Sequence, residues 1–166
     1  MNLYHKTDHF LTHWLAQRGI VFLRLSIGFI FIWFGGLKFF PGASPAEELA
    51  LSAISVLTFD LIPESPALFL LAGFEVLIGA GLIFGRYMRI ILLMLIIQMI
   101  GTMSPVLLFP EIVFNSPPFL LTIEGQYILK NVIVISSAMV IGATVRGGGL
   151  TASSDSEPDL SEQDSD

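Results

Sequence analysis

Several ionisable side chains lie inside stretches that are apolar enough to cross a lipid bilayer. Arg24 and Lys38 lie in "LRLSIGFIFIWFGGLKFF" and Glu75 lies in "PALFLLAGFEVLIGAGLIFG". One full charge at the bilayer centre costs roughly 2.5–3.5 kcal/mol, so such residues usually face the bundle interior and pair. We predict that Arg24 pairs with Glu75 at an inner or middle level, with Lys130 approaching. We predict a second pair, Lys38 with Glu124, near the outer edge.

The two cations of the first stretch are spaced to share one face of a helix. Arg24 and Lys38 are 14 residues apart, which at about 100° per residue falls about 40° short of four full turns. We therefore predict one polar seam through the bundle. The candidate pocket residues are Arg24, Lys38, Glu75, Gln98, Glu124, Tyr127, Lys130 and Asn131. In the alternative interpretation, the pairs only neutralise charge and fix helix register, and Lys38 extends to the interface without a partner.

Three histidines recur every four residues in "YHKTDHFLTHW". On a helix, His5, His9 and His13 would form one imidazole face, which is a weak candidate for a transition-metal site. The interpretation that we favour is an amphipathic cytoplasmic helix at the membrane surface, without metal. None of these histidines lies at membrane depth, so we do not expect haem ligation within the chain.

The composition is typical of a membrane protein. Hydrophobic residues make up 54% of the 166 residues and charged residues 13%, whereas soluble domains contain about 25% charged residues. Four apolar runs, at about 19–40, 66–85, 88–109 and 122–145, each suffice to cross a hydrocarbon core of about 30 Å. The predicted fold class is all-α, an integral membrane four-helix bundle. Pro105 should kink or end the third helix near its outer end.

The charges of the connecting segments predict the orientation. Segments on one side of the spans contain the bases Lys6, Arg18, Arg86, Arg89 and Arg146. Segments 41–65 and 110–121, on the other side, contain acids and no base. By the positive-inside rule, both termini should face the cytoplasm. We also predict a short amphipathic helix in the first outer loop, within "SPAEELALSAISVLTFD".

The chain divides into three predicted segments. Residues 1–17 form the amphipathic cytoplasmic segment, residues 18–146 the four-helix domain, and residues 147–166 an acidic tail. The tail holds six acids and no base, and we expect it to be disordered because it has little apolar surface to bury. Nucleic acid is excluded as a partner, since there is no basic patch and the tail would repel phosphate. The absence of cysteine excludes disulfides and thiol catalysis.

The order of short motifs along the four spans resembles a known family. These motifs are "LRLSIGFIFIWFGGLKF", "AGFEVLIGAGLIFG", "GTMSPVLLFP" and "EGQYILKNVIVISSAMVIGA". Over about residues 20–146 the chain resembles the DoxX-like four-helix membrane proteins, within them the reactive-chlorine-resistance (YkgB/RclC) branch. The resemblance implies a multi-pass protein of the bacterial cytoplasmic membrane. It also implies that Arg24, Lys38, Glu75 and Lys130 occupy the family's polar positions.

The resemblance also implies a function, because some relatives are subunits of quinol or thiosulfate:quinone oxidoreductase systems or of oxidative-stress complexes. We expect an accessory membrane subunit linked to redox or quinone chemistry, which binds other oxidoreductase subunits and is not catalytic alone. A quinone is the expected ligand. One alternative is a small transporter or channel that uses the polar seam. Another is a structural subunit that binds a partner or a second copy of itself.

Overall fold

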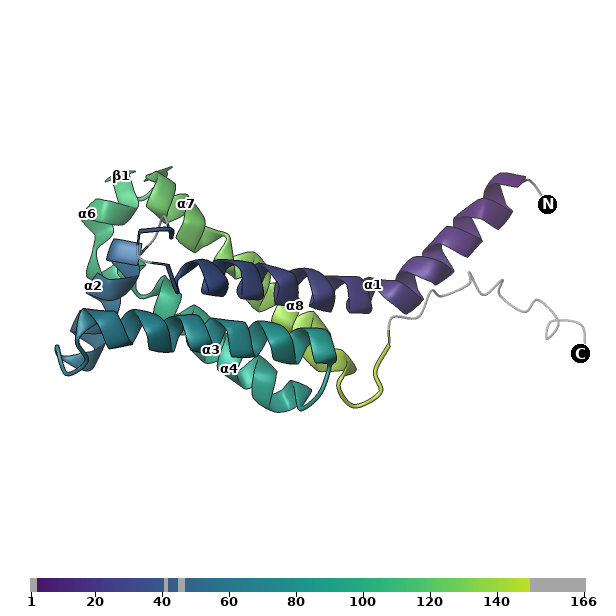
Figure 1. The fold of residues 1–166 in the computed structure, drawn as a ribbon. Helices are drawn as coiled ribbons and strands as arrows, with labels where there is room; N and C mark the ends of the chain where they lie inside the picture. Colours follow the sequence, from purple (N-terminus) through teal and green to yellow (C-terminus); the bar gives the residue numbers. More distant parts are fainter. Residues whose placement is uncertain (1–2, 41, 45–46, 150–166) are drawn as a thin grey trace, which may run out of the picture.

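The fold is a bundle of four long apolar helices with shorter elements gathered at one end (Figure 1). The structure, a computed structural model, describes residues 3–40, 42–44 and 47–149, with side chains from residue 7 onward. Its longer helices are α1 (Leu3–Leu37), α2 (Glu47–Thr58), α3 (Glu64–Phe84), α4 (Met88–Met103) and α8 (Asn131–Thr144). The shorter elements are α5 (Pro105–Leu108), α6 (Pro110–Val113), β1 (Phe114–Ser116), β2 (Leu120–Leu121) and α7 (Ile123–Leu129).

The predicted all-α membrane bundle is confirmed. Within the described residues, four helical segments are long and apolar enough to cross a membrane: Thr7–Leu37, Glu64–Phe84, Met88–Leu108 and Ile123–Thr144. The third segment is interrupted between α4 and α5, where Pro105 occupies the first position of α5. This confirms the predicted effect of Pro105, whose missing N–H cannot continue the helical hydrogen-bond ladder.

Helix α1 is longer than the predicted first span. It runs without interruption from Leu3 to Leu37, so residues 3–17 continue the spanning helix instead of forming a separate one. The N-terminal part of α1 projects beyond the bundle (Figure 1). The helix also ends before Phe40, and Lys38 lies in the turn that follows, its N–H donating to the Gly35 carbonyl at 3.2 Å.

Helices α1 and α3 approach each other closely because glycines line their contact. A Cβ built on Gly79 would lie 2.6 Å from the carbonyl oxygen of Gly28, and one on Gly28 would lie 2.9 Å from the carbonyl oxygen of Gly79. Neither position can carry a side chain without displacing backbone. Small residues that let two backbones approach are typical of membrane helix packing, where van der Waals contact replaces the hydrophobic effect.

An apolar core fills the bundle between α1, α3, α4 and α8. Its most buried members are Ile78, Leu82 and Leu95, each 0% exposed, and Ile27 and Phe31 of α1 pack into the same cluster. Many large apolar side chains outside this core are exposed, such as Phe29 and Trp33. An apolar exterior is expected of helices whose surroundings are lipid.

A second, smaller cluster lies at the end of the bundle opposite the turn between α3 and α4 (Figure 1). Leu49 of α2 packs there with Val113 of α6 and Ile128 of α7. The strands β1 and β2 pair antiparallel beside them. Helix α2 is the helix predicted within the first interhelical loop, and it covers this end of the bundle (Figure 1). The predicted acidic tail, apart from residues 147–149, lies outside the described residues.

Candidate functional site

Three polar side chains from three different spans meet inside the bundle. The Nζ of Lys38 lies 2.6 Å from Glu75 Oε2 in an ion pair. The Nε2 of Gln98 donates to the other carboxylate oxygen, Oε1, at 2.9 Å. Lys38 is 9% exposed, and Glu75 and Gln98 are each 7% exposed. We call these three residues the mid-span cluster.

The mid-span cluster lies near the middle of the membrane-spanning helices. Glu75 is central in α3 (Glu64–Phe84), ten residues before Gly85 and therefore about 15 Å from that end of the helix. Gln98 is similarly central in the third span, Met88–Leu108. Lys38 reaches this depth because Gly35, one turn before it, lies beside Glu75 of α3, and the Lys38 side chain contacts the Glu75 carboxylate. The prediction that Lys38 lies close to the outer edge is therefore wrong.

Local structure favours a cation at position 38 and close packing beside it. Lys38 directly follows the C-terminus of α1, where the helix dipole stabilises positive charge. One turn earlier, Gly35 lets α3 approach, since a Cβ there would lie 2.8 Å from the Cβ of Glu75. Both carboxylate oxygens of Glu75 thus receive donors, as a charge in a medium of low dielectric requires.

The fourth span contributes a second lysine near this level. The Nζ of Lys130 lies 4.1 Å from the ring centroid of Tyr127 and 5.0 Å from that of Phe34 on α1. Lys130 lies at the break between α7 and α8, and its carbonyl accepts an i+3 bond from Ile133 at 3.0 Å. A local departure from α-helical bonding within a span often marks a functional position. The aromatic rings stabilise the ammonium group without neutralising it.

One further polar contact ties α8 to α4 beside the mid-span cluster. Asn131 Nδ2 donates to Thr102 Oγ1 at 3.3 Å, and Thr102 follows Gln98 by one turn of α4. Each of the four spans therefore contributes at least one polar side chain around the mid-span level. Phe34 and Thr102, which belong to this environment, were not among the residues predicted from the sequence. Their positions one turn from Lys38 and Gln98 could have identified them.

The predicted pairing of Arg24 with Glu75 is wrong. The guanidinium of Arg24 instead lies against Gly85, at the C-terminal end of α3. A Cβ added to Gly85 would collide with this guanidinium. Gly85 has φ 70° and caps α3 through its N–H, which donates to the Gly81 carbonyl at 2.9 Å. A cation at this helix end is stabilised by the dipole of α3. Arg24 and Lys38 both contact α3, so they lie on the same side of the first span, as predicted.

The predicted pairing of Lys38 with Glu124 is also wrong, because Lys38 is paired with Glu75. Glu124 lies in the first turn of α7, where a carboxylate is favoured by the helix dipole. It has no ion-pair partner among the residues that the structure describes.

The polar seam predicted from Arg24 to Lys38 is interrupted. Ile27 and Phe31 lie between these residues on the same face of α1, and they are 5% and 6% exposed. Both pack against Ile78 and Leu82 of α3 in the main apolar core. The charged groups therefore form separate sites at two depths.

The histidine face is only partly within the described side chains. The rings of His9 and His13 stack with centroids 6.4 Å apart, and His13 Nε2 lies 2.8 Å from Gln17 Nε2. The side chain of His5 lies outside the described residues. No group of three ligating side chains occurs in the described part of the chain.

Comparison with known proteins identifies the family. A sequence model of the DoxX family matches residues 19–109, which is more than half of the chain. The chain belongs to the DoxX family. The match covers the membrane part of α1, the whole of α2 to α4, and α5, and hence all three members of the mid-span cluster. Lys130 and the fourth span lie beyond the matched region of this DoxX protein. No curated protein and no solved structure matches the chain.

Proposed function

We propose that this DoxX protein is an accessory subunit of a membrane redox complex and binds a quinone head group beside the mid-span cluster. The observation that carries the proposal is the buried convergence of Lys38, Glu75 and Gln98 around an ion pair, with Lys130 of the fourth span nearby on the exposed side. Buried ionisable groups in membrane spans are expensive and are therefore functional candidates. A role in oxidative-stress defence, as in the reactive-chlorine-resistance branch, belongs to the same proposal.

The donors of the mid-span cluster fit the oxygens of a quinone. Lys38 has three N–H donors and uses one on Glu75, and Gln98 uses one of two. Lys38 and Gln98 can therefore donate to a carbonyl oxygen while still holding Glu75. Glu75 in turn fixes the positions of both donors. A bound quinone would supply the electron-transfer chemistry, and these residues would bind and orient its ring.

Lys130 and its aromatic neighbours suggest how such a ligand reaches the cluster. Lys130 is exposed on the outside of the bundle, and Tyr127 is 37% exposed beside it. In the membrane this surface faces lipid, the phase in which quinones dissolve. Lys130, Tyr127 and Phe34 together offer a cation and two aromatic faces to a flat polar ring.

We expect Lys130→Gln to weaken quinone binding without unfolding the protein. A hydrogen bond to a charged group contributes about 1.5–3 kcal/mol, so the affinity should fall about 10- to 100-fold. The measurement is equilibrium dialysis of a short-chain benzoquinone against protein in nanodiscs. Arg18→Gln, which removes an exposed cation far from the cluster, serves as the control. Equal affinity in Lys130→Gln and wild type would count against the proposed function.

The proposed orientation places both termini in the cytoplasm of a bacterial cell. It is supported by the charges: Arg86 and Arg89 lie where α3 ends and α4 begins, and Arg146 follows α8 beside Arg89, at the end of the bundle where α1 projects (Figure 1). Because the chain has no cysteine, single-cysteine variants give a direct test. We expect a membrane-impermeant maleimide to label Ser116→Cys in spheroplasts and to label Tyr87→Cys only after lysis. The reverse pattern would invert the orientation.

The two other proposed functions have less structural support. A transporter or channel would need a polar path, and the main apolar core interrupts the one predicted along α1. A purely structural subunit remains the simpler alternative and would also use the ion pair to fix helix register. This alternative predicts that Lys130→Gln binds a partner subunit or a second copy as wild type does. It also predicts that neither protein binds a quinone.

A further inference from the structure

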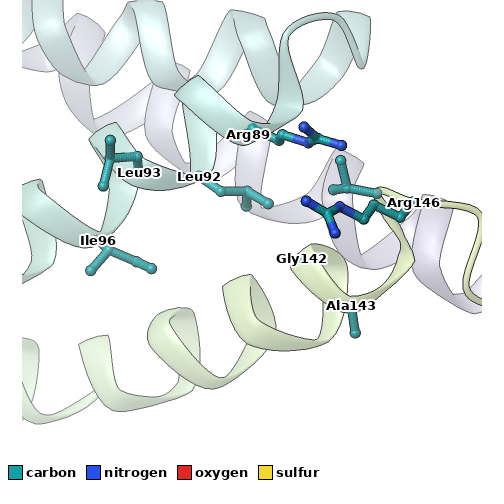
Figure 2. A pocket seen from close by; sticks show the side chains of 8 residues that line it. Arg89, Leu92, Leu93, Ile96, Gly142, Ala143 and Arg146 are labelled. Atoms are coloured by element: carbon teal, nitrogen blue, oxygen red, sulfur yellow. The ribbon is translucent and has the colours of Figure 1, made fainter.

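A groove lies between α4 and α8, where α4 begins and α8 ends (Figure 2), and no member of the mid-span cluster lines it. Its volume is about 570 Å³. The floor is apolar, formed by Leu92, Leu93, Ile96 and Val145. Gly142 of α8 contributes no side chain, which widens the groove. Such a shape accommodates part of an acyl chain lying along the two helices.

Two arginines from different helices lie at one end of this groove. Arg89 is the second residue of α4, and Arg146 follows the end of α8 (Figure 2). Neither has an acidic partner among the described residues, and no acid lines the groove. Arg89 also lies at the N-terminus of α4, where the helix dipole favours an anion and disfavours a lone cation. A negatively charged group between the two guanidinium groups would offset the repulsion between the two arginines. It would also offset the unfavourable interaction of Arg89 with the dipole of α4.

A third cation lies on the other side of the same end of α8. A smaller hollow of about 130 Å³ is lined by Arg24, Ile20, Val21 and Val145, so it shares Val145 with the groove. The Nε of Arg24 is buried there and has no hydrogen-bond partner. Arginines therefore border both hollows beside Val145, and this end of the bundle is electropositive.

We propose that the groove between α4 and α8 binds one anionic phospholipid, with the head-group phosphate held by Arg89 and Arg146. The groove combines an apolar floor with guanidinium groups at the end of the spans, where lipid head groups lie. Basic pockets between membrane helices on the cytoplasmic side are suited to anionic head groups. A soluble anion would satisfy the arginines but leave the apolar floor uncovered.

The test is native mass spectrometry of the full chain after exchange into vesicles of phosphatidylglycerol or phosphatidylcholine. We expect wild type to retain one phosphatidylglycerol and no phosphatidylcholine. Each basic residue near the surface contributes about fivefold to anionic-lipid binding, so the Arg89→Gln/Arg146→Gln variant should retain it at least about tenfold less. Arg86→Gln, which removes an exposed arginine of the same turn that does not line the groove, should retain it as wild type does.

Four results would overturn this inference, the last of them by assigning the site to a soluble anion. One is equal retention by the double variant, and another is equal retention of phosphatidylcholine. The third is retention only by a chain ended after Gly149, which would show that the acidic residues beyond it fill the groove. Displacement of the lipid by millimolar inorganic phosphate would assign the site to a soluble anion instead. Lys130→Gln tests the proposed quinone binding, and the Arg89→Gln/Arg146→Gln variant tests the lipid site. The two proposals can therefore fail independently.

Discussion

Glu75→Ala is expected to lower the free energy of unfolding by about 3–5 kcal/mol. The substitution removes the only ion-pair partner that Lys38 has among the described residues and leaves its ammonium group buried. It also deprives Gln98 of its acceptor. The measurement is reversible unfolding of the protein in mixed micelles, followed by circular dichroism.

The double variant Lys38→Met/Glu75→Leu separates the ion pair from its burial. Both charges are then absent and the volume is roughly conserved, so the stability should return to within about 1–2 kcal/mol of wild type or exceed it. The single variants Lys38→Met and Glu75→Leu should each be far less stable than the double variant. If the loss of stability in the double variant equalled the sum of the losses in the two single variants, Lys38 and Glu75 would not be energetically coupled, which would contradict the ion pair.

Gly79→Ala is expected to destabilise the protein by about 1–3 kcal/mol, the range for overpacking a tight contact. The added methyl group would meet the Gly28 carbonyl oxygen at 2.6 Å and the Ile32 backbone nitrogen at 2.8 Å. Backbone atoms cannot move aside as a flexible side chain can, so α1 and α3 would have to separate. Thermal unfolding in the same micelles measures the effect.

Gly73→Ala is the matched control on the same helix. A Cβ at Gly73 meets nothing within 4 Å, so this variant should be as stable as wild type or gain about 0.5–1 kcal/mol from the higher helix propensity of alanine. If Gly79→Ala and Gly73→Ala were equally stable, this result would contradict the close backbone contact between α1 and α3 at Gly79. Separation of the helices in Gly79→Ala should also disturb the mid-span cluster, because Gly35 and Lys38 lie on the same side of α1.

The spans were predictable because length and hydropathy alone determine which segments can cross a bilayer. Pro105 and the helix at 47–58 were also predictable, since local proline and amphipathic patterns do not depend on the tertiary structure. The partners of Arg24 and Lys38 were not. Their depths were inferred by assuming that the first apolar run spans the membrane from Gly19 to Phe40, whereas α1 starts earlier and ends at Leu37. The offset of α1 along α3, which places Gly35 beside Glu75, is what brings Lys38 to the level of Glu75.

The identity of the polar residues was easier to predict than their pairing. Glu75, Gln98 and Lys130 were recognisable because ionisable or amide groups are costly at the centre of a span. Which of them meet depends on the rotation and offset of each helix. The rotation and the offset of a helix depend in turn on close contacts such as that between Gly28 and Gly79. A sequence pattern shows which side of a helix is polar, but it does not show how far one helix is displaced along another.

The most direct test of the central claim is photolabelling of the protein in nanodiscs with an azidoquinone, followed by mass-spectrometric mapping of the labelled residues. Binding beside the mid-span cluster predicts labels near Phe34–Lys38 and Tyr127–Asn131. Excess unlabelled quinone should suppress them, and Lys130→Gln should lose them. Labels spread evenly over the lipid-facing helices, or labels unaffected by competing quinone, would contradict quinone binding beside the mid-span cluster. The ion pair would then have only a structural role.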